Sequence, residues 1–461
     1  MHDLSTIVKA YDIRGLVPDQ LNEEVARAVG AAFVEVLGSP GSVVIGHDMR
    51  PSSVPLATAF ARGVTSRGAN VVMIGLASTD QLYYASGFMD MPGAMFTASH
   101  NPAQYNGIKL CRAGAAPVGQ DTGLAQIREL AEQILAGGSG SASQPDDGSG
   151  RGVIEQRDVL AGYATHLLSL VPLQGIRPLT VVVDAGNGMA GHTVPAVLDV
   201  PGITLVPLYF ELDGTFPNHE ANPIEPENLR DLQAAVVDHG ADLGLAFDGD
   251  ADRCFVVDER GAAVNPSVLT ALIATRELER APGQRVVHNL ITSRAVPEIV
   301  REHGGEPVRT RVGHSFIKQT MAETGAVFGG EHSAHYYFRD FWRADSGMLA
   351  ALHTLAALGG SPVGTALSEL IAPYDRYVSS GEINSTVSDQ AAVTAAVEAS
   401  FAAREGVSVD HLDGLTVQHD DWWFNLRPSN TEPLLRLNVE AVDAPTMERI
   451  RDDVLNTVRG T

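Results

Sequence analysis

The stretch ADLGLAFDGDADRCFVVD, residues 241–258, indicates the fold class. A continuous apolar run ends in a charged loop, and a second apolar run follows it. Apolar runs of this kind, alternating with helices, are typical of parallel strands that helices cover on both faces. In such sheets the loops after the strands form the ligand crevice, so the chemistry is expected in those loops.

The same pattern extends outward along the chain, because short strand-like runs alternate with helical patterns. The strand-like runs are SVVIGHD at 42–48, NVVMIG at 70–75, GAMFTASH at 93–100, LTVVVDAG at 179–186, ADLGLAFDGD at 241–250 and RVVHNLI at 285–291. The helical patterns cover residues 22–37, 55–67, 228–239, 267–280 and 293–303. These alternations predict successive α/β units.

Changes in composition and in the pattern of strands and helices predict where the domains end. The low-complexity stretch GGSGSASQPDDGSGRG, residues 137–152, is typical of a flexible linker or surface loop. From about residue 370 the alternation gives way to a small α+β pattern with a terminal helix. We predict three α/β domains with mixed or parallel sheets, then an α+β domain. Their expected ranges are 1–150, 151–255, 256–369 and 370–461.

The composition bounds the class of protein. Hydrophobic residues make up 44% of the 461 residues and charged residues 19%, which is ordinary for a folded chain. The net charge of −24 argues against nucleic acid or anionic membranes as partners. Two cysteines, no signal-like N-terminus and no apolar run near ~20 residues predict a cytoplasmic protein with no membrane span. The oligomeric state stays open.

Lysine is rare in this chain. Only three of the 32 basic residues are lysines, namely Lys9, Lys109 and Lys318, and the rest are arginines. A lysine that persists in an arginine-rich chain can mark a place where a guanidinium cannot replace an ammonium.

Three carboxylates at alternate positions, Asp248, Asp250 and Asp252, follow the strand-like run LGLAF. On an extended chain they can converge, and oxygen ligands suit a hard cation such as Mg²⁺. An EF-hand loop is one alternative, with Glu259 at its twelfth position. However, Arg253 stands where that loop needs glycine, and the flanks are strand-like. A solvated acidic loop is the other alternative.

The segment TASHNP, residues 97–102, places Ser99 on a turn at the end of a strand, where a serine can be an exposed nucleophile. His100 could orient or polarise it, and Lys109 in the following YNGIK segment could stabilise charge or move protons. The alternative is a plain turn initiated by Asn-Pro.

Two further loops are rich in polar groups. GGEHSAH, residues 329–335, could bind sugar hydroxyls, and RPSNTEP, residues 427–433, combines a guanidinium with small donors that suit a phosphate. Either loop could instead be a polar turn.

The segment GNGMAG, residues 186–191, matches a dinucleotide-binding pattern, with Glu211 and Asp213 about 20 residues later. Asp184 before it and Pro195 in the following helix argue against that role. We interpret it as a tight glycine turn, and an NAD-dependent dehydrogenase stays an alternative.

Taken together, TASHNP with NGIK, DGDADR, GEHSAH and RPSNTEP resemble the phosphoserine, metal, sugar and phosphate loops of the α-D-phosphohexomutase family, in the family's order. VKAYDIRG at 8–15 and RVGHSFIK at 311–318 also match, so the resemblance covers essentially the whole chain. All three lysines fall inside these segments. One departure is Ala334, where the sugar loop usually has glycine. GEHSAHYYFRDFW looks most like the phosphomannomutase branch, since phosphoglucosamine mutases more often have glutamine in place of His332.

The resemblance implies four domains around a central cleft. It also implies an enzyme that interconverts mannose 6-phosphate and mannose 1-phosphate through phosphorylated Ser99 and a hexose 1,6-bisphosphate. Mg²⁺ would be held by Ser99, Asp248, Asp250 and Asp252. The catalytic groups would be Ser99, His100, Lys109, Arg14 and Arg253. The substrate-binding groups would be Arg311, Glu331, His332, Ser333, His335, Arg427, Ser429, Asn430 and Thr431.

Other functions stay open at this point. Glucose phosphate or glucosamine phosphate could be the preferred substrate within the same family. Outside it, the alternatives are a non-catalytic sugar-phosphate sensor, the dehydrogenase named above, and a hydrolase that passes the phosphoryl group to water. Hexose phosphates are the expected small-molecule partners.

Overall fold

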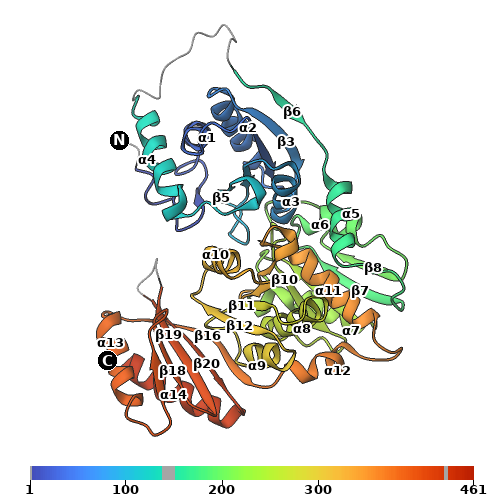
Figure 1. The fold of residues 1–461 in the computed structure, drawn as a ribbon, viewed down its shortest axis with the longest axis vertical. Helices are drawn as coiled ribbons and strands as arrows, with labels where there is room; N and C mark the ends of the chain where they lie inside the picture. The colour runs from blue at the N-terminus through green and yellow to red at the C-terminus, as the bar shows by residue number, and fades with distance from the viewer. Residues whose placement is uncertain (1–2, 138–150, 430–433, 461) are drawn as a thin grey trace. The chain divides into compact units, whose positions relative to one another are not determined.

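The computed structural model describes residues 3–137, 151–429 and 434–460. The chain forms two compact units, each built from two separate stretches. Unit 1 comprises Met1–Val264 and Ser333–Leu370, and unit 2 comprises Asn265–His332 and Ile371–Thr461. Figure 1 follows the chain through the elements of each unit.

The first part of unit 1 is a six-stranded mixed sheet in the order β1-β5-β4-β2-β3-β6. Strands β2, β3, β4 and β6 are parallel, whereas β5 is antiparallel to both β4 and β1. The elements are β1 (Ile13–Leu16), α1 (Glu23–Val36), β2 (Ser42–His47), α2 (Ser53–Thr65), β3 (Asn70–Leu76), α3 (Thr79–Met89), β4 (Gly93–Phe96), β5 (Tyr105–Cys111), α4 (Leu124–Leu135) and β6 (Ile154–Gln156).

Helices cover both faces of this sheet. Val43 and Ile45 of β2 point into one core with residues of α1, α2 and α4, while Val44 between them points into the other with Leu82 and Ala85 of α3. Successive strand side chains point to opposite faces, so a strand between two helix layers must be apolar throughout. That requirement explains the continuous apolar runs of the sequence.

A second, four-stranded sheet in unit 1 has the order β10-β9-β7-β8. Here β9 and β8 flank β7 in parallel, and β10 returns antiparallel to β9. The remaining elements of unit 1 are α5 (Leu160–Leu170), β7 (Leu179–Asp184), α6 (Ala190–Val197), β8 (Ile203–Leu208), α7 (Arg230–Asp238), β9 (Leu243–Phe247), β10 (Cys254–Asp258), β14 (Tyr336–Phe338), β15 (Ala344–Asp345), α11 (Gly347–Gly359) and, at its end, α12 (Leu367–Ile371).

Unit 2 contains a parallel βα segment and an antiparallel sheet. The βα segment comprises α8 (Pro266–Arg280), β11 (Arg285–Asn289), α9 (Ala295–Glu302), β12 (Glu306–Thr310), α10 (His314–Thr324) and β13 (Phe328–Gly330). The antiparallel part comprises β16 (Val378–Thr386), α13 (Gln390–Phe401), β17 (Ser408–Asp410), β18 (Leu415–Gln418), β19 (Trp422–Pro428), β20 (Leu434–Ala441) and α14 (Ala444–Gly460).

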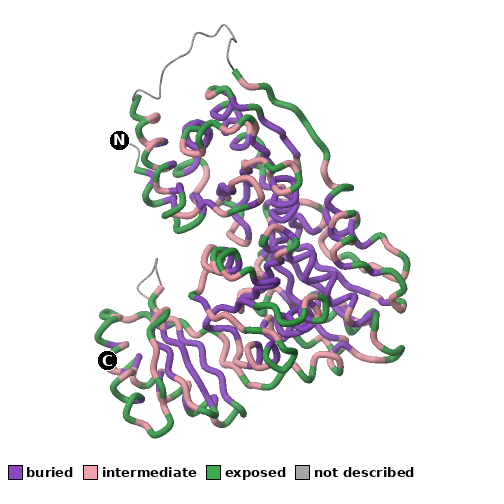
Figure 2. Tube along the Cα trace, in the orientation of Figure 1, coloured by how far each residue is buried: buried purple, intermediate pink, exposed green. Residues whose placement is uncertain are grey.

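The antiparallel sheet, in the order β16-β20-β19-β18-β17, packs with α13 and α14. Phe424 of β19 and Leu437 of β20 share one core with Val397 of α13 and Ile450 of α14. The central strands of this sheet are largely buried and its helices keep an exposed side, as Figure 2 shows.

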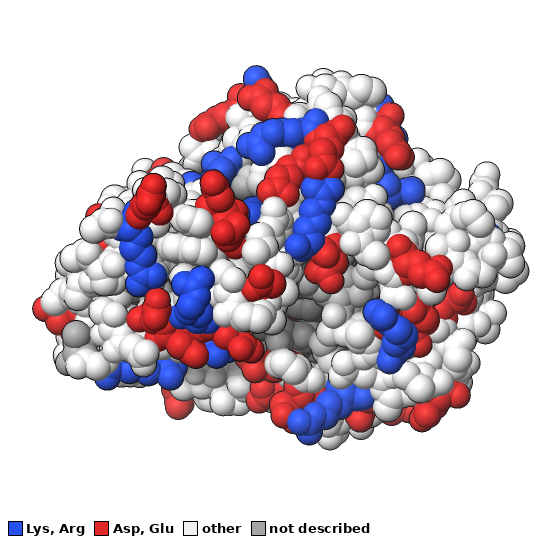
Figure 3. Space-filling view, turned by 90° about the horizontal axis from the view of Figure 1, so that it is seen from below, with Lys and Arg blue, Asp and Glu red and all other residues white. Residues whose placement is uncertain are grey.

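The predicted fold class is confirmed: α/β layers precede a C-terminal α+β part. Each of the five helical patterns corresponds to a helix, and each of the six runs contains a strand. Most of the 137–152 stretch lies outside the described residues, and the four domain ranges stay a prediction. None of the described helices has the length and apolar character for a membrane crossing. Acidic and basic side chains are interspersed on the face in Figure 3.

Candidate active site

Ser99 lies in the loop after β4, at the end of the strand as its sequence position predicts. Its backbone adopts φ 50°, a left-handed conformation that is uncommon for a residue with a side chain. The Ser99 hydroxyl donates to Oδ2 of Asp248 at 2.8 Å, and its N–H donates to Oγ1 of Thr97 at 2.9 Å. The expected exposure is not observed, since Ser99 is only 2% exposed. Contacts from distant segments cover it.

The acidic loop joins β9 to β10, so the predicted strand-like flanks are present. One oxygen from each of Asp248, Asp250 and Asp252 lies within 4.8 Å of the others. The three side chains are buried, and Oδ1 of Asp250 and Oδ1 of Asp252 have no hydrogen-bond partner. Buried carboxylate oxygens without partners are costly, and a hard cation would satisfy them. The donor set therefore fits a divalent cation such as Mg²⁺.

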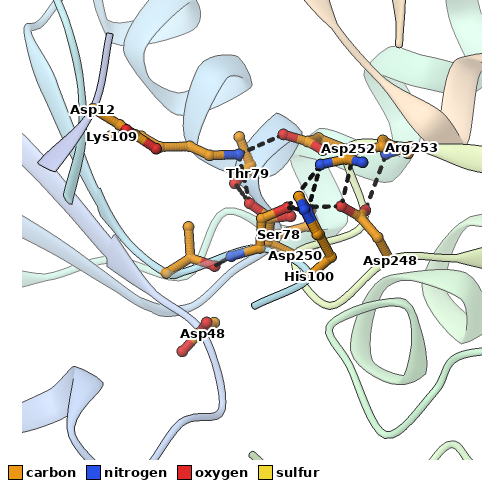
Figure 4. Close-up of polar contacts among 12 residues, drawn as sticks. Asp12, Asp48, Ser78, Thr79, His100, Lys109, Asp248, Asp250, Asp252 and Arg253 are labelled. Atoms are coloured by element: carbon orange, nitrogen blue, oxygen red, sulfur yellow. Dashed lines mark hydrogen bonds and ion pairs between the residues drawn. The ribbon is translucent and has the colours of Figure 1, made fainter. Parts of the chain in front are cut away.

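Two cationic side chains contact these carboxylates (Figure 4). Nζ of Lys109, from β5, lies 2.7 Å from Oδ2 of Asp250 and 2.6 Å from Oδ2 of Asp252. Nε of Arg253 lies 3.3 Å from Oδ2 of Asp248. The two cations offset part of the charge of the three carboxylates.

The cluster splits the proton affinities of its members. Burial, and then the charges of Asp252 and Asp250, raise the pKa of Asp248 well above its ordinary value. Burial alone would raise the pKa of Asp250, but the Lys109 ammonium, the Thr79 hydroxyl and the charge of Arg253 together outweigh burial and lower that pKa. Burial alone would lower the pKa of Lys109, but the two carboxylates outweigh it and raise that pKa. Lys109 is therefore an ammonium at neutral pH.

His100 lies beside the serine hydroxyl. Its Nδ1 is 3.2 Å from Oγ of Ser99 and 2.6 Å from the Nη2 of Arg253. A guanidinium only donates, so Nδ1 of His100 accepts. Burial, followed by the charge of Arg253, lowers the pKa of His100 well below its ordinary value. His100 is thus a neutral imidazole next to Ser99.

His335 reaches the same cluster through a β-bridge between its backbone and that of Arg253. Its Nδ1 lies 3.0 Å from Oγ of Ser333, and its Nε2 lies 3.8 Å from Oδ1 of Asp252. Burial, with the charge of Arg253, lowers the pKa of His335 to about 4. Arg14 in β1 contacts the serine loop from another side, because its Nη1 donates to Oδ1 of Asn101.

The predicted substrate-binding residues Glu331, His332 and Arg311 lie in unit 2. Glu331 is 2% exposed, and its Oε1 accepts from the Gly313 N–H and from Nδ2 of Asn289, both at 3.2 Å. Burial lowers the pKa of His332, so this side chain is neutral. The guanidinium of Arg311 lies over the ring of Phe316 at 4.8 Å.

In the predicted phosphate loop, Nη2 of Arg427 lies 3.1 Å from Oε2 of Glu382. Arg436, directly opposite Arg427 on β20, approaches the other oxygen of Glu382 at 3.3 Å. The Ser429 N–H donates to the Leu434 carbonyl. Asn430 and Thr431 lie outside the described residues.

Sequence reasoning missed Thr79, the first residue of α3. Its hydroxyl donates to Oδ2 of Asp250 at 2.6 Å, and its N–H donates to the Asp250 carbonyl at 3.0 Å. Thr79 thus fixes both the backbone and the side chain of one aspartate of the acidic loop. It also follows a parallel strand, β3, so its position at a strand end is the sequence signal for it.

The glycine turn at 186–191 packs on the acidic loop. The Met189 N–H donates to the Gly249 carbonyl at 2.9 Å, and a Cβ on Gly188 would lie 2.7 Å from that carbonyl oxygen. Asp184 accepts from the Gly186 N–H at 2.8 Å and from His219, 2.9 Å away. The glycines therefore have a packing reason that needs no dinucleotide.

Family comparisons match four consecutive parts of the chain. They are described as phosphoglucomutase/phosphomannomutase α/β/α domain I over residues 5–136, domain II over 161–261, domain III over 265–377 and the C-terminal domain over 382–457.

Individual relatives agree with that match. A phosphomannomutase of Salmonella montevideo is 41% identical over 460 residues, which cover 98% of each chain. The crystal structure of a phosphoglucomutase/phosphomannomutase family protein from Burkholderia thailandensis superposes with a TM-score of 0.87, at 34% identity, covering 100% of this chain and 98% of the other. An Aspergillus fumigatus N-acetylphosphoglucosamine mutase, in complex with GlcNAc-6P and magnesium, shares the fold at a TM-score of 0.62 and 14% identity, covering 99% and 97%.

Proposed function

The chain belongs to the phosphoglucomutase/phosphomannomutase family, and on that premise we propose that it is a phosphomannomutase. As a family member it is an enzyme of the phosphohexomutase kind. The proposed reaction is the reversible interconversion of mannose 6-phosphate and mannose 1-phosphate through a phosphoserine and a hexose 1,6-bisphosphate. One observation carries this proposal. The Ser99 hydroxyl donates a hydrogen bond to Asp248, and it lies beside Arg253 and the cluster that Asp248 forms with the other two aspartates.

Ser99 is the proposed phosphoryl carrier. Phosphorylated Ser99 would give its phosphoryl group to a hydroxyl of the hexose monophosphate, and Ser99 Oγ would then take the phosphoryl group from the other end of the bisphosphate. When Oγ attacks, its proton has an acceptor in place, namely Oδ2 of Asp248 at 2.8 Å. Nη2 of Arg253, 3.4 Å from Oγ, would stabilise negative charge on the transferring group.

Ser99, Asp248, Asp250 and Asp252 would hold Mg²⁺. When bound, the ion supplies positive charge that offsets the charge of the transferring phosphoryl group. The buried Oδ1 atoms of Asp250 and Asp252, which accept no hydrogen bond from the described residues, support this assignment, and the Aspergillus relative was solved with magnesium.

Lys109, with His100, is the proposed acid/base pair at the sugar hydroxyl, and Arg14 and His335 are further candidates. Lys109 is charged at neutral pH and so carries a proton to donate, whereas its raised pKa makes the ammonium a weak acid. His100 and His335 are neutral at that pH and so can accept a proton, whereas their lowered pKa values make both rings weak bases.

Substrate binding is assigned to two loops. Glu331, His332 and Ser333 would bind sugar hydroxyls near the middle of the ring, which keep similar positions when the bisphosphate turns over. The phosphate that does not react would be bound by Arg427, Ser429, Asn430 and Thr431, together with Arg311. Nη2 of Arg427 pairs with Glu382 while its Nε has no hydrogen-bond partner among the described residues, so the guanidinium keeps donor capacity for an anion.

The test is product analysis with mannose 1-phosphate, glucose 1-phosphate and glucosamine 1-phosphate, in the presence of a hexose bisphosphate and Mg²⁺. Peptide mass spectrometry should find a phosphoryl group on Ser99 in active enzyme. Ser99→Ala should abolish turnover. Release of inorganic phosphate instead of the isomeric sugar phosphate would identify a hydrolase and defeat the proposal.

Mannose should be preferred over glucose, because several full-length relatives at about 40% identity carry the phosphomannomutase name. The two sugars differ only in the direction of the C2 hydroxyl. One net hydrogen bond is worth about 0.5–1.5 kcal/mol, or roughly 2- to 13-fold, and an unpaired buried group raises this to about 3 kcal/mol, or roughly 150-fold. We expect a kcat/KM ratio within these limits, and a ratio below one would favour a phosphoglucomutase.

A further inference from the structure

Arg50, in the loop between β2 and α2, is one of the most deeply buried charges of the described chain. Its Nε donates to Oδ2 of Asp48 at 3.2 Å. The remaining N–H groups of its guanidinium meet backbone carbonyls of one short segment. Nη1 donates to Pro102 and Tyr105 at 2.9 and 3.0 Å, and Nη2 donates to Ser99 and Asn101 at 3.0 and 2.7 Å.

This arrangement uses the full donor capacity of an arginine, which carries five N–H groups in a rigid planar fork. Four of its contacts fall on residues 99–105, the segment that contains Ser99. A lysine could not reproduce them, because an ammonium offers three donors from a single point.

Asp48 fixes the guanidinium from its own side. Its Oδ1 accepts from the Arg50 N–H at 2.9 Å and from the hydroxyl of Ser53, and its Oδ2 accepts from Nε of Arg50. The ring of Phe216 lies 5.0 Å from the guanidinium carbon. Asp48 stands outside the network of dashed contacts around the aspartates in Figure 4. Arg50 therefore contacts the serine segment through its backbone carbonyls and makes no hydrogen bond to the three aspartates of the cluster among the described contacts.

The segment needs such support. Ser99 holds a left-handed backbone conformation, which persists only where the surroundings determine it. Its carbonyl oxygen lies between Nη2 of Arg50 and Gly249, where a Cβ on that glycine would approach the oxygen to 2.5 Å. The guanidinium thus holds the backbone of Ser99 against the loop that carries Asp248 and Asp250.

We propose that Arg50 is a positioning residue that fixes segment 99–105 and so holds the Ser99 hydroxyl against the metal loop. The expected effect of Arg50 on turnover rests on the proposed function, in which Ser99 Oγ is the reacting atom. Its effect on the position of segment 99–105 is independent of that function. A misplacement of about 1 Å can cost about 10²-fold in rate even when the mutation lies away from the chemistry.

The test compares wild type, Arg50→Lys and the control Arg62→Lys, an exposed arginine in α2. Circular dichroism should show the wild-type fold in all three. Hydrogen–deuterium exchange should become at least several-fold faster in peptides that cover 97–107 of Arg50→Lys, and should stay unchanged at 179–184. With mannose 1-phosphate, its kcat should fall about 10²-fold while KM changes by less than about 3-fold.

Asp48→Asn is the second variant, and its use does not depend on whether Arg50→Lys folds. It removes one acceptor of the guanidinium and leaves the four carbonyls, so the same pattern should appear with about a 10-fold fall in kcat. Unchanged exchange at 97–107 together with a kcat within about 3-fold of wild type, or a change in KM alone, would overturn the inference. If wild type lacks mutase turnover, the proposed function fails, and the exchange result still decides the role of Arg50 in holding the segment.

Discussion

At the scale of single residues, Gly249 shows how little space separates the serine loop from the metal loop. A Cβ at this position would lie 2.5 Å from the Ser99 carbonyl oxygen, which belongs to the backbone and cannot rotate away. Gly249→Ala should therefore displace Ser99 and lower kcat by about 10²-fold. Steady-state kinetics measure the effect.

The matched control for this prediction is Gly41→Ala. No atom lies within 4 Å of a Cβ built on Gly41, so the added methyl group meets open space. Its kcat should equal that of wild type. Equal kcat values for the Gly249→Ala and Gly41→Ala variants would show that the two loops do not need this close approach.

Asp80 gives a pH dependence that belongs to a single residue. It accepts hydroxyl hydrogen bonds from Ser78, Tyr163 and Ser346, but burial dominates and raises its pKa to about 6 from the ordinary 3.8. Between these two values the folded chain binds the additional proton. The contribution of Asp80 to the free energy of unfolding is therefore greatest at low pH and is lost as the pH rises through about 6.

Asp80→Asn should remove this dependence. Relative to the variant, the wild type should lose on the order of 2–3 kcal/mol of unfolding free energy between about pH 4 and pH 7, because one pKa unit corresponds to about 1.4 kcal/mol. Urea unfolding of both proteins at the two pH values measures the difference. A difference that is the same at both pH values would contradict the assignment to Asp80.

At the scale of elements, the contact between α1 and α2 depends on two glycines. A Cβ on Gly63 of α2 would lie 2.1 Å from the Arg27 carbonyl oxygen of α1, and a Cβ on Gly30 of α1 would lie 2.3 Å from the Phe60 carbonyl oxygen. Replacing a glycine inside a helix by alanine normally stabilises a protein by up to about 1 kcal/mol. At Gly63 and Gly30 the clash with the backbone should make the same replacement destabilising.

Gly63→Ala should destabilise the protein by about 1–3 kcal/mol, since the two helices must move apart. Gly460→Ala at the end of α14, where a Cβ would meet nothing within 4 Å, is the control and should be neutral or slightly stabilising. Thermal unfolding of the three proteins compares them. A Gly63→Ala variant as stable as wild type would rule out the tight crossing.

At the scale of the whole molecule, the four proposed metal ligands all belong to unit 1. Added Mg²⁺ should therefore raise the thermal unfolding midpoint, by a free energy of about 2.7 kcal/mol when its concentration is 100 times its dissociation constant. It should slow hydrogen exchange in peptides that cover 243–258 and leave those of β16–β20 unchanged.

Chelation should abolish turnover, and Zn²⁺ should substitute poorly because it favours nitrogen and sulfur ligands.

Asp250→Asn should lose this response to Mg²⁺. The variant keeps the size of the side chain and removes its charge, so it separates binding at the aspartates from a general salt effect. If Mg²⁺ slows exchange equally in both units, or stabilises Asp250→Asn as much as wild type, the ion does not bind at these aspartates.

Local sequence patterns were enough to predict the layers of the fold and the loops that hold the candidate site. Strand and helix identity followed from local patterns, because a strand buried on both faces must be apolar throughout, as in β2 and β9. The position of Ser99 at a strand end and the spacing of Asp248, Asp250 and Asp252 are equally local. Their assignment to one family came from the order of the motifs along the chain.

The tertiary structure alone decided which of these groups meet and how they ionise. Lys109 contacts Asp250 across 141 positions of sequence, and Arg50 reaches the Ser99 carbonyl across 49. No local pattern encodes such pairings, because they depend on which strands become neighbours in the folded sheet. Proton affinities follow the same rule. The raised pKa of Asp80 and the lowered pKa of His335 both arise from burial, which exists only after distant segments have packed around each group.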